Sequence, residues 1–391
     1  MVIRENYLAK IRPFIGKDII KVLTGIRRGG KSVLLEQIRD EIGSPNTIFL
    51  NFEDLGNQHL CEYNALHDYV CEKIGDSKEQ FYLFFDEVQE VQGWEKAVNS
   101  LRVKFHADIY ITGSNSRLLS GELATYIAGR YISFVVYPFS FTEFQMADPG
   151  LTFHQYIQYG GMPFLSSINF EPEISKNYLQ DIFNSVVLKD IVKRNNIRDV
   201  DLLERIIAYA LANVGRSFSA TSISKFFKAE NRTAAPETIL NYLKACEEAY
   251  LLYRLKSQNI NGKKVLKVNE KYYVADHGLR EAVIGSNLQN VEIVLENIVG
   301  LELLRRGYKV CVGRVGTKEI DFIGEKQGDK LYIQVCYLLS DEATIQREFG
   351  SLLEVRDNYP KLVLYKEGSF RGNYEGIPAM RIEDWLAGKN V

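Results

Sequence analysis

The stretch "GIRRGGKS" at residues 25–32 is the feature that most constrains the fold of this chain. Its spacing, Gly-x-x-x-x-Gly-Lys-Ser, requires a strand before it and a helix after it. Both are predicted, because residues 19–25 are apolar and β-branched, while residues 31–43 carry apolar side chains at helical spacing and end at a glycine. The sequence therefore predicts a loop that cradles phosphate groups, since backbone N–H groups and the helix dipole favour an anion there.

Residues of this loop have separate predicted roles. Lys31 brings a positive charge to the β- and γ-phosphates, and the hydroxyl of Ser32 is a ligand for Mg²⁺. We therefore expect ATP and Mg²⁺ to bind the N-terminal part of the chain. The expected nucleotide contacts in the loop and the first helical turn are Gly25, Arg28, Gly29, Gly30, Lys31, Ser32 and Val33.

A second predicted strand, within residues 80–91, ends in two acidic residues. The apolar run from Phe81 to Phe85 is followed directly by Asp86 and Glu87. A buried strand that ends in this way resembles a Walker B element, in which Asp86 holds Mg²⁺, directly or through water. Glu87 is then expected to orient and polarise the attacking water. The alternative is a simple acidic pair at the end of a strand.

A third strand is predicted over residues 107–116 and ends in polar residues. Ser114 and Asn115 are the candidates to contact the γ-phosphate or the water, with a plain turn as the alternative. Further along, Arg130 precedes an aromatic strand. An arginine near the phosphates stabilises charge in the transition state, whether from the same chain or from a neighbour. A structural role for Arg130 fits the sequence equally well.

The centre of the chain differs in character from the N-terminal part. Strand–helix alternation stops after about residue 150, and helical periodicity follows, with Asp190 expected in a surface ion pair. Residues 201–275 contain twelve Lys/Arg and seven Asp/Glu in the order helix, capped helix, capped helix and hairpin, the hairpin turning at Asn261-Gly262. This order predicts a winged helix-turn-helix, which often binds duplex DNA. Protein contact is the alternative, because the last helix carries Glu237, Glu247 and Glu248.

The C-terminal stretch 294–339 has the order helix with an acid, strand with an acid, and adjacent strand. This order resembles the PD-(D/E)xK nuclease core, in which carboxylates bind Mg²⁺ and a lysine assists the attacking water. The matching positions are Glu296, Asp321, Gln334 and Cys336, so a cysteine stands where the lysine is needed. We therefore expect a nuclease-shaped domain that is slow or inert.

The totals restrict the class of protein. A chain of 391 residues is too long for one core, and its net charge of −2 leaves only local basic surfaces. Five scattered cysteines without a C-x-x-C pair favour a reducing, cytoplasmic location. No apolar run is long enough to cross a membrane. The oligomeric state is not predicted.

Taken in order along the chain, "GIRRGGKS", "FFDEVQ", "ITGSNS", "YGGMP", "PETILNYL", "LEN" and "EIDF" resemble the prokaryotic AAA-type P-loop ATPases that have a C-terminal nuclease-like domain. The resemblance implies nucleotide contacts at Gly30, Lys31 and Ser32, metal and water roles at Asp86 and Glu87, and a sensor or finger role for Arg130. It supplies no substrate. Relatives with this pattern tend to lack the nuclease lysine as well.

The expected fold is α/β and has four parts. They are a P-loop parallel-sheet ATPase domain over 1–150, a helical connector over 151–200, a winged helix-turn-helix over 201–275 and a restriction-endonuclease-like α/β domain over 276–391. Three functions remain open. They are an ATPase whose nucleotide state repositions the winged helix and the nuclease-like domain, on DNA or otherwise; an ATP-dependent DNA nuclease; and a slow, ATP-bound scaffold that recruits a protein partner.

Overall fold

The computed structural model describes residues 1–119, 129–260, 265–285, 291–368, 370 and 372–389. These residues form two compact units. Unit 1 comprises Met1–Pro138 with Glu248–Tyr250, and unit 2 comprises Phe139–Glu247 with Leu251–Val391. Within the described ranges, no helix is both long and apolar enough to cross a membrane.

Unit 1 is built on a parallel five-stranded sheet with the strand order β2-β3-β4-β1-β5. Its strands are β1 (Ile20–Thr24), β2 (Thr47–Asn51), β3 (Phe81–Asp86), β4 (Ala107–Gly113) and β5 (Tyr131–Val135). Its helices are α1 (Glu5–Ile11), α2 (Lys31–Ile42), α3 (Tyr63–Ile74) and α4 (Trp94–Lys104). The parallel α/β sheet expected for the N-terminal part is thereby confirmed.

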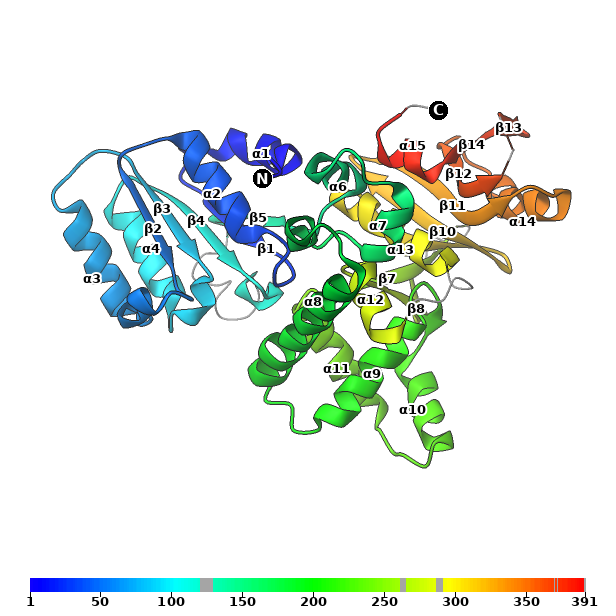
Figure 1. Cartoon of the computed structure of the whole chain (residues 1–391), viewed down its shortest axis with the longest axis horizontal. Coiled ribbons are helices and arrows are strands. Elements are labelled where there is room, and N and C mark those ends of the chain that lie inside the picture. The colour runs from blue at the N-terminus through cyan, green and yellow to red at the C-terminus, as the bar shows by residue number, and fades with distance from the viewer. Residues whose placement is uncertain (120–128, 261–264, 286–290, 369, 371, 390–391) are drawn as a thin grey trace. The chain divides into compact units, whose positions relative to one another are not determined.

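Alternation along the strands gives this sheet two apolar faces, each of which a pair of helices covers. Leu23, Phe84 and Tyr110 lie on one face, in the cluster that contains residues of α1 and α2. Their neighbours Val22 and Leu83 lie in the other cluster, with residues of α3 and α4. Figure 1 shows the two helix pairs on opposite sides of the sheet. Because helices cover both faces, the edge formed by the carboxyl ends of the strands is the one that stays open.

Unit 2 begins with helices and adds a large mixed sheet. Its helices are α6 (Phe141–Ala147), α7 (Phe153–Tyr159), α8 (Pro172–Ser185), α9 (Val200–Ala212), α10 (Ala220–Ala229), α11 (Pro236–Glu248), α12 (His277–Ile284), α13 (Val291–Arg305), α14 (Glu342–Leu353) and α15 (Ile382–Leu386). Its strands are β6 (Ser217–Phe218), β7 (Leu252–Asn259), β8 (Val265–Val274), β9 (Lys309–Val315), β10 (Lys318–Lys326), β11 (Asp329–Leu339), β12 (Lys361–Gly368), β13 (Asn373–Tyr374) and β14 (Ile377–Arg381).

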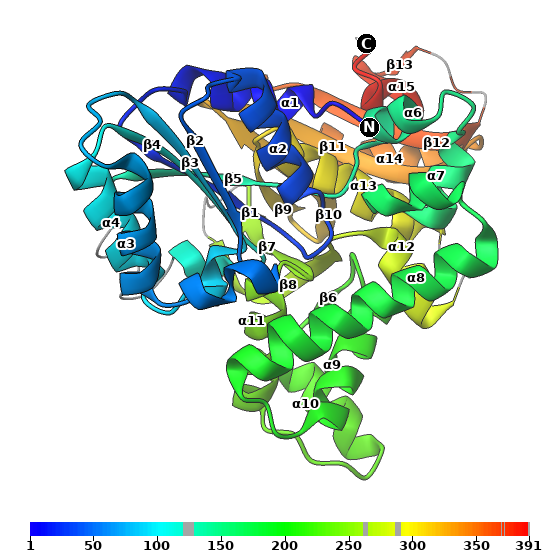
Figure 2. The ribbon, with the colours of Figure 1, turned by 60° about the vertical axis from the view of Figure 1, so that its left-hand side comes forward.

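The nine strands have the order β13-β14-β12-β11-β10-β9-β7-β8-β6 in one sheet. β7 pairs with β8 and, on its other edge, runs parallel to β9. Figure 2 shows α9 and α10 below this sheet. Strand pairing of β7 with β9 thus joins the segments on either side of residue 275 in one sheet. The four-part division expected from the sequence stays a prediction. The expected turn at Asn261-Gly262 lies outside the described residues.

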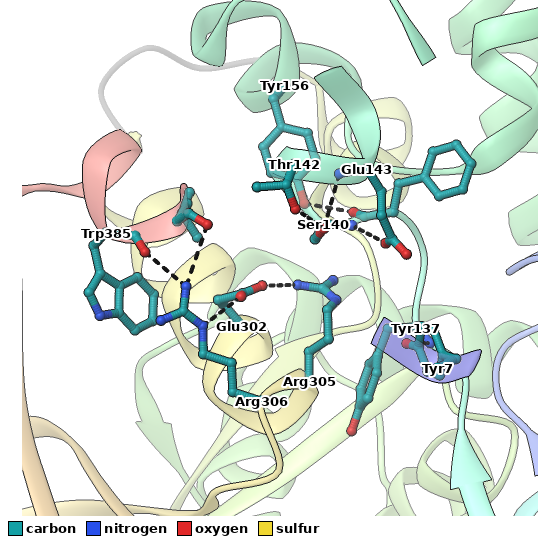
Figure 3. Close-up of polar contacts among 12 residues, drawn as sticks. Tyr7, Tyr137, Ser140, Thr142, Glu143, Tyr156, Glu302, Arg305, Arg306 and Trp385 are labelled. Atoms are coloured by element: carbon teal, nitrogen blue, oxygen red, sulfur yellow. Dashed lines mark hydrogen bonds and ion pairs between the residues drawn. The ribbon is translucent and has the colours of Figure 1, made fainter. Parts of the chain in front are cut away.

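Two polar junctions stabilise unit 2. At the start of α6, Ser140 and Glu143 form a capping box, in which the Ser140 N–H donates to Glu143 Oε2 at 2.9 Å (Figure 3). At the other junction, the Arg306 Nη2 group donates to the Trp385 carbonyl at 2.8 Å, and its guanidinium lies 4.2 Å from the centre of the Trp385 ring. Arg306 thus holds the last helix, α15, against α13.

Asp190 differs from its expected place on the surface. It is 1% exposed, in the π-helical segment Val186–Lys193 that continues α8, and the Arg194 Nη2 atom lies 3.2 Å from its Oδ1 atom. The ion pair is present, but its carboxylate is buried, because the segment turns this face inward.

Candidate functional site

The loop between β1 and α2 has the backbone form that a phosphate cradle needs. Gly25 has φ +145°, and a Cβ atom there would lie 2.1 Å from the Val136 carbonyl oxygen. Gly30 has φ +94° and precedes the first residue of α2. Arg28 has φ +63°, a left-handed conformation that is uncommon for a residue with a side chain. Only glycine fits at position 25, so the loop's path is set by its sequence.

Lys31 lies inside this loop. Its side chain is 3% exposed, and its ammonium group donates to the carbonyls of Gly25 and Ile26 at 3.1 and 3.0 Å. The same Nζ atom lies 3.9 Å from Glu87 Oε1. The loop and the end of β3 therefore meet at one point. Ser32 follows at the start of α2, while Arg28 and Val33 are exposed and Gly29 is buried.

Asp86 is buried at the carboxyl end of β3, with hydrogen-bond donors on both sides. The Thr112 hydroxyl donates to its Oδ1 atom at 2.5 Å, and the Asn51 amide donates to its Oδ2 atom at 3.0 Å. Burial raises the pKa of Asp86, while hydrogen bonds from Thr112 and Ser32 oppose that rise. The contact with Ser32 brings together the two predicted metal ligands.

Glu87 has a strained backbone and a fixed side chain. Its φ is +53°, and its N–H group donates to the Thr112 hydroxyl at 2.9 Å. The Gln89 amide donates to Glu87 Oε2. No sequence pattern singles out Gln89. Its contact with Glu87 depends on the left-handed turn after β3, which a β-strand pattern does not predict.

Asn115, just after β4, presents a donor that the described chain does not satisfy. The residue is 4% exposed, and its Oδ1 atom accepts from the Arg117 N–H at 2.7 Å. Its Nδ2 group is buried and has no hydrogen-bond partner among the described residues. Burying an amide without a hydrogen-bond partner costs free energy. Such a group is therefore often hydrogen-bonded to a ligand or a water molecule. Ser114 beside it is fully buried.

Arg130 lies at the wrong edge of the sheet for a role in its own nucleotide site. Its carbonyl accepts from the Ile20 N–H at 2.9 Å, at the start of β1, whereas the P-loop follows the other end of that strand. Its guanidinium donates to Asn99 Oδ1 at 3.0 Å. Of the possibilities that the sequence left open for Arg130, this position speaks against a role in the site of its own chain and fits a structural role. A contribution to a neighbouring copy stays a prediction.

Arg4 is a residue near this site that sequence reasoning missed. It is 1% exposed, and its guanidinium donates to the carbonyls of Gly29 at 3.0 Å and Tyr137 at 2.9 Å. The Arg4 N–H also donates to Gln37 Oε1 in α2 at 3.1 Å. Arg4 thus stabilises the P-loop through its hydrogen bond to the Gly29 carbonyl. No motif marks it, because the residues that its guanidinium binds here, Gly29 and Tyr137, are distant from it in the sequence.

The three residues matched to a nuclease core come together in unit 2. Glu296 lies on α13, Asp321 on β10 and Gln334 on β11, and the Asp321 N–H donates to Gln334 Oε1 at 3.4 Å. A β-bulge interrupts the pairing of β10 with β9 between Ile320 and Ile323, next to Asp321. Cys336 is 2% exposed, and burial raises the pKa of its thiol, so it cannot replace a lysine.

A lysine nevertheless lies among these acids, contributed by β8. The Nζ atom of Lys271 is 2.7 Å from Glu319 Oε1, 2.9 Å from Glu296 Oε1 and 4.0 Å from Asp321 Oδ1. We call Glu296, Glu319 and Asp321 the carboxylate cluster. Spacing alone could not show that Lys271 reaches it, because the lysine lies in a different part of the chain.

A model of the AAA domain matches residues 17–145, which contain this loop and the ends of β3 and β4. A domain of unknown function, DUF8612, matches residues 150–290. The chain is 40% identical over 99% of its length to an uncharacterized protein of Haemophilus influenzae, of which it covers 98%. It is 34% identical over 94% of its length to an uncharacterized protein of Methanocaldococcus jannaschii, of which it covers 89%. The chain belongs to the family of these two proteins.

Distant likenesses exist among solved structures. AMPPCP-bound DnaA from Aquifex aeolicus is 14% identical with a TM-score of 0.33, the match covering 63% of this chain and 90% of that chain. The Aeropyrum pernix ORC1 protein in complex with DNA is 9% identical with a TM-score of 0.30, covering 72% and 92%. TM-scores this low carry no inference about ligands or partners of this chain.

Proposed function

We propose that this protein is a Mg²⁺-dependent ATPase whose nucleotide site is formed by the β1–α2 loop and the ends of β3 and β4. The observation that carries the proposal is the meeting of Lys31, Asp86 and Glu87 at one edge of the sheet, with the unpartnered Asn115 amide at the end of β4. The buried Nδ2 group of Asn115 fits a donor that a bound nucleotide or its water would satisfy.

Each residue then has a role. The loop N–H groups and Lys31 bind the phosphates, and Gly25, Gly29 and Gly30 let the backbone approach them. Ser32 and Asp86 would hold Mg²⁺, which supplies charge neutralisation at the β- and γ-phosphates when it is bound. Their mutual hydrogen bond in the structure fits a shared ligand.

Glu87, directly after β3, and the amide of Asn115, after β4, act on the water. Glu87 orients and polarises the attacking water, and Gln89 holds the Glu87 carboxylate in place. The Nδ2 group of Asn115 donates to the γ-phosphate or to that water. Catalysis on this scheme is positioning and electrostatic stabilisation.

The output of the nucleotide cycle is proposed to be a movement of unit 2, which we infer to contain a winged helix-turn-helix. The element order α9, β6, α10, α11, β7 and β8 supports that assignment. Duplex DNA is the proposed partner of this segment, with a protein partner as the alternative. All five cysteines are free thiols, which supports a cytoplasmic location.

The decisive experiment is steady-state ATP hydrolysis with Mg²⁺, with and without duplex DNA, beside binding of a fluorescent ATP analogue. We expect Lys31→Ala to lose binding and turnover, and Glu87→Gln to keep binding and lose turnover. Glu90→Gln is the matched control, because Glu90 is an exposed acid three residues beyond Glu87.

The outcomes separate the candidates. Turnover that rises with DNA supports an ATPase that acts on DNA, and turnover indifferent to DNA supports a protein partner. Binding without turnover in the wild type would replace the ATPase proposal by a nucleotide-bound scaffold. Equal turnover in Glu87→Gln and Glu90→Gln would contradict the role of Glu87.

A further inference from the structure

We propose that Lys271 is the built-in cation of the carboxylate cluster, so that this cluster binds no divalent metal ion in the native chain. Its ammonium group lies within ion-pair distance of carboxylates from two elements, α13 and β10. Mg²⁺ would need these same oxygens in close octahedral coordination. The lysine therefore takes the position and the charge that a metal ion would otherwise supply.

The carboxylate oxygens are already engaged by protein donors. The Tyr273 hydroxyl donates to Glu296 Oε1 at 2.6 Å, the same atom that Lys271 contacts. The other oxygen of Glu296 faces Gly215, where an added Cβ atom would lie 2.9 Å from Oε2. Asp321 Oδ2 accepts from the Val335 N–H at 2.9 Å. In the part of the chain that the structure describes, no group of three or more acidic, histidine or cysteine side chains is arranged to hold a metal.

The electrostatic balance favours a permanent ammonium. The Lys271 side chain is 3% exposed, and this burial lowers its pKa, but the attraction of Glu296, Asp321 and Glu319 outweighs burial and raises the pKa overall. Burial and the nearby Glu296 raise the pKa of Asp321, which Lys271 partly offsets. The charged lysine therefore offsets the free-energy cost of keeping these carboxylates together inside the protein.

The lysine also joins β8 to α13. Asn297, the residue after Glu296 on α13, accepts from the Val274 N–H at 2.8 Å and donates to the Val274 carbonyl at 3.0 Å. Both side chains of this "EN" pair therefore bind β8, one through Lys271 and the other through the backbone. Glu296, which the sequence pattern assigned to a metal, instead holds β8, the predicted wing strand, against α13.

The test measures Mn²⁺ binding by electron paramagnetic resonance on the full-length chain without nucleotide. Every arm carries Asp86→Asn, so that the nucleotide site does not contribute a metal ligand. The arms are the Lys271 parent, Lys271→Met, Lys271→Met with Asp321→Asn, and Lys318→Met. The last is the matched control, because Lys318 forms an exposed ion pair with Glu354 in the same unit.

We expect no stoichiometric Mn²⁺ site in the parent or in Lys318→Met. Lys271→Met should bind one Mn²⁺ at least about tenfold more tightly, because a positive charge is removed within about 4 Å of the carboxylates. Mn²⁺ should also raise the unfolding temperature of Lys271→Met alone, and Asp321→Asn should abolish both effects. Equal Mn²⁺ binding in parent and Lys271→Met would overturn the proposal.

Two measurements on the chain with its native Lys271 keep the proposal testable if Lys271→Met does not fold. Acetylation of folded protein, read by mass spectrometry, should leave Lys271 protected to the same degree with and without Mn²⁺. Increased labelling of Lys271 in Mn²⁺ would mean that the metal displaces it. Metal-dependent DNA cleavage that Asp321→Asn abolishes would instead make Lys271 a catalytic lysine. Neither result depends on ATP hydrolysis, so the proposal stands or fails apart from the ATPase.

Discussion

At the scale of single residues, the proposed nucleotide site combines groups that binding would need with groups that only turnover would need. Lys31 and the loop backbone would contact the phosphates in every bound state. Asn115 and Glu87 lie at the ends of neighbouring strands and are assigned to the attacking water or the γ-phosphate. Variants at these two sets of positions should therefore separate affinity from rate.

Replacing Asn115 by alanine should lower kcat by about 10²-fold while changing nucleotide affinity little, because its unpartnered Nδ2 group would act on developing charge. The measurement is steady-state hydrolysis beside equilibrium binding of a fluorescent ATP analogue. Asn99→Ala is the control, since Asn99 binds Arg130 at the other edge of the sheet. An unchanged kcat in Asn115→Ala would remove this residue from the mechanism.

Replacing Gly25 by alanine should abolish nucleotide binding, because the new Cβ atom would lie 2.1 Å from the Val136 carbonyl in a backbone with φ +145°. Binding is measured with the same analogue, and folding by thermal unfolding. Gly75→Ala is the control for backbone strain, since Gly75 has φ +58° with nothing within 4 Å of the added atom. Normal affinity in Gly25→Ala would show that the loop tolerates another path.

At the scale of elements, one buried carboxylate joins α12 to the Gly160-Gly161 turn. Asp276 Oδ2 accepts from the Gly161 N–H at 2.6 Å, and Oδ1 accepts from the Leu279 N–H at 3.3 Å as the N-cap of α12. Asp276→Ala should therefore lower the free energy of unfolding by about 2–4 kcal/mol. Asp276→Asn keeps an acceptor and should cost less. Urea denaturation monitored by circular dichroism measures both.

The same buried carboxylate predicts a pH dependence of stability. Burial raises the pKa of Asp276 in the folded chain, although His277 and the Gly161 N–H lower it in part. The native state then binds more protons than the unfolded state, so wild-type stability falls as pH rises from about 4 through the raised pKa. Asp276→Asn has no carboxyl group to bind this proton. Its loss of stability relative to the wild type should therefore shrink as pH rises over that window. A deficit independent of pH would contradict the raised pKa.

The elements that the sequence predicted well are those with strong local patterns. β1, β3 and β4 are buried apolar runs, and α2 follows a glycine loop, so local residues suffice to define them. β13, β14 and α15 were missed, since they are short and Pro378 interrupts the strand pattern. Contacts between distant residues, such as that of Arg4 with Gly29, or of Lys271 with Glu296, leave no periodic signal at all.

At the scale of the whole molecule, charge counted from sequence overstates the free basic surface. Of the basic residues in 201–275, Lys271 is buried among carboxylates, and Arg254 pairs with Glu247 and Glu270. Arg205 and Arg232 share Asp201. With a net charge of −2 for the chain, any binding of DNA must rely on a local group of basic residues.

Lys225 and Lys228 are exposed on α10 and are the described lysines of that helix that DNA phosphates would contact. Replacing both by alanine should reduce the slope of log affinity against log salt by about 2, because each phosphate contact contributes about 0.9. Fluorescence anisotropy of a labelled duplex over a series of NaCl concentrations measures the slope. The control replaces Lys73 and Lys78, two exposed lysines of unit 1. An equal loss in both variants would mean that DNA is retained by total charge and that α10 has no special role, while wild-type retention independent of salt would favour a protein partner for unit 2.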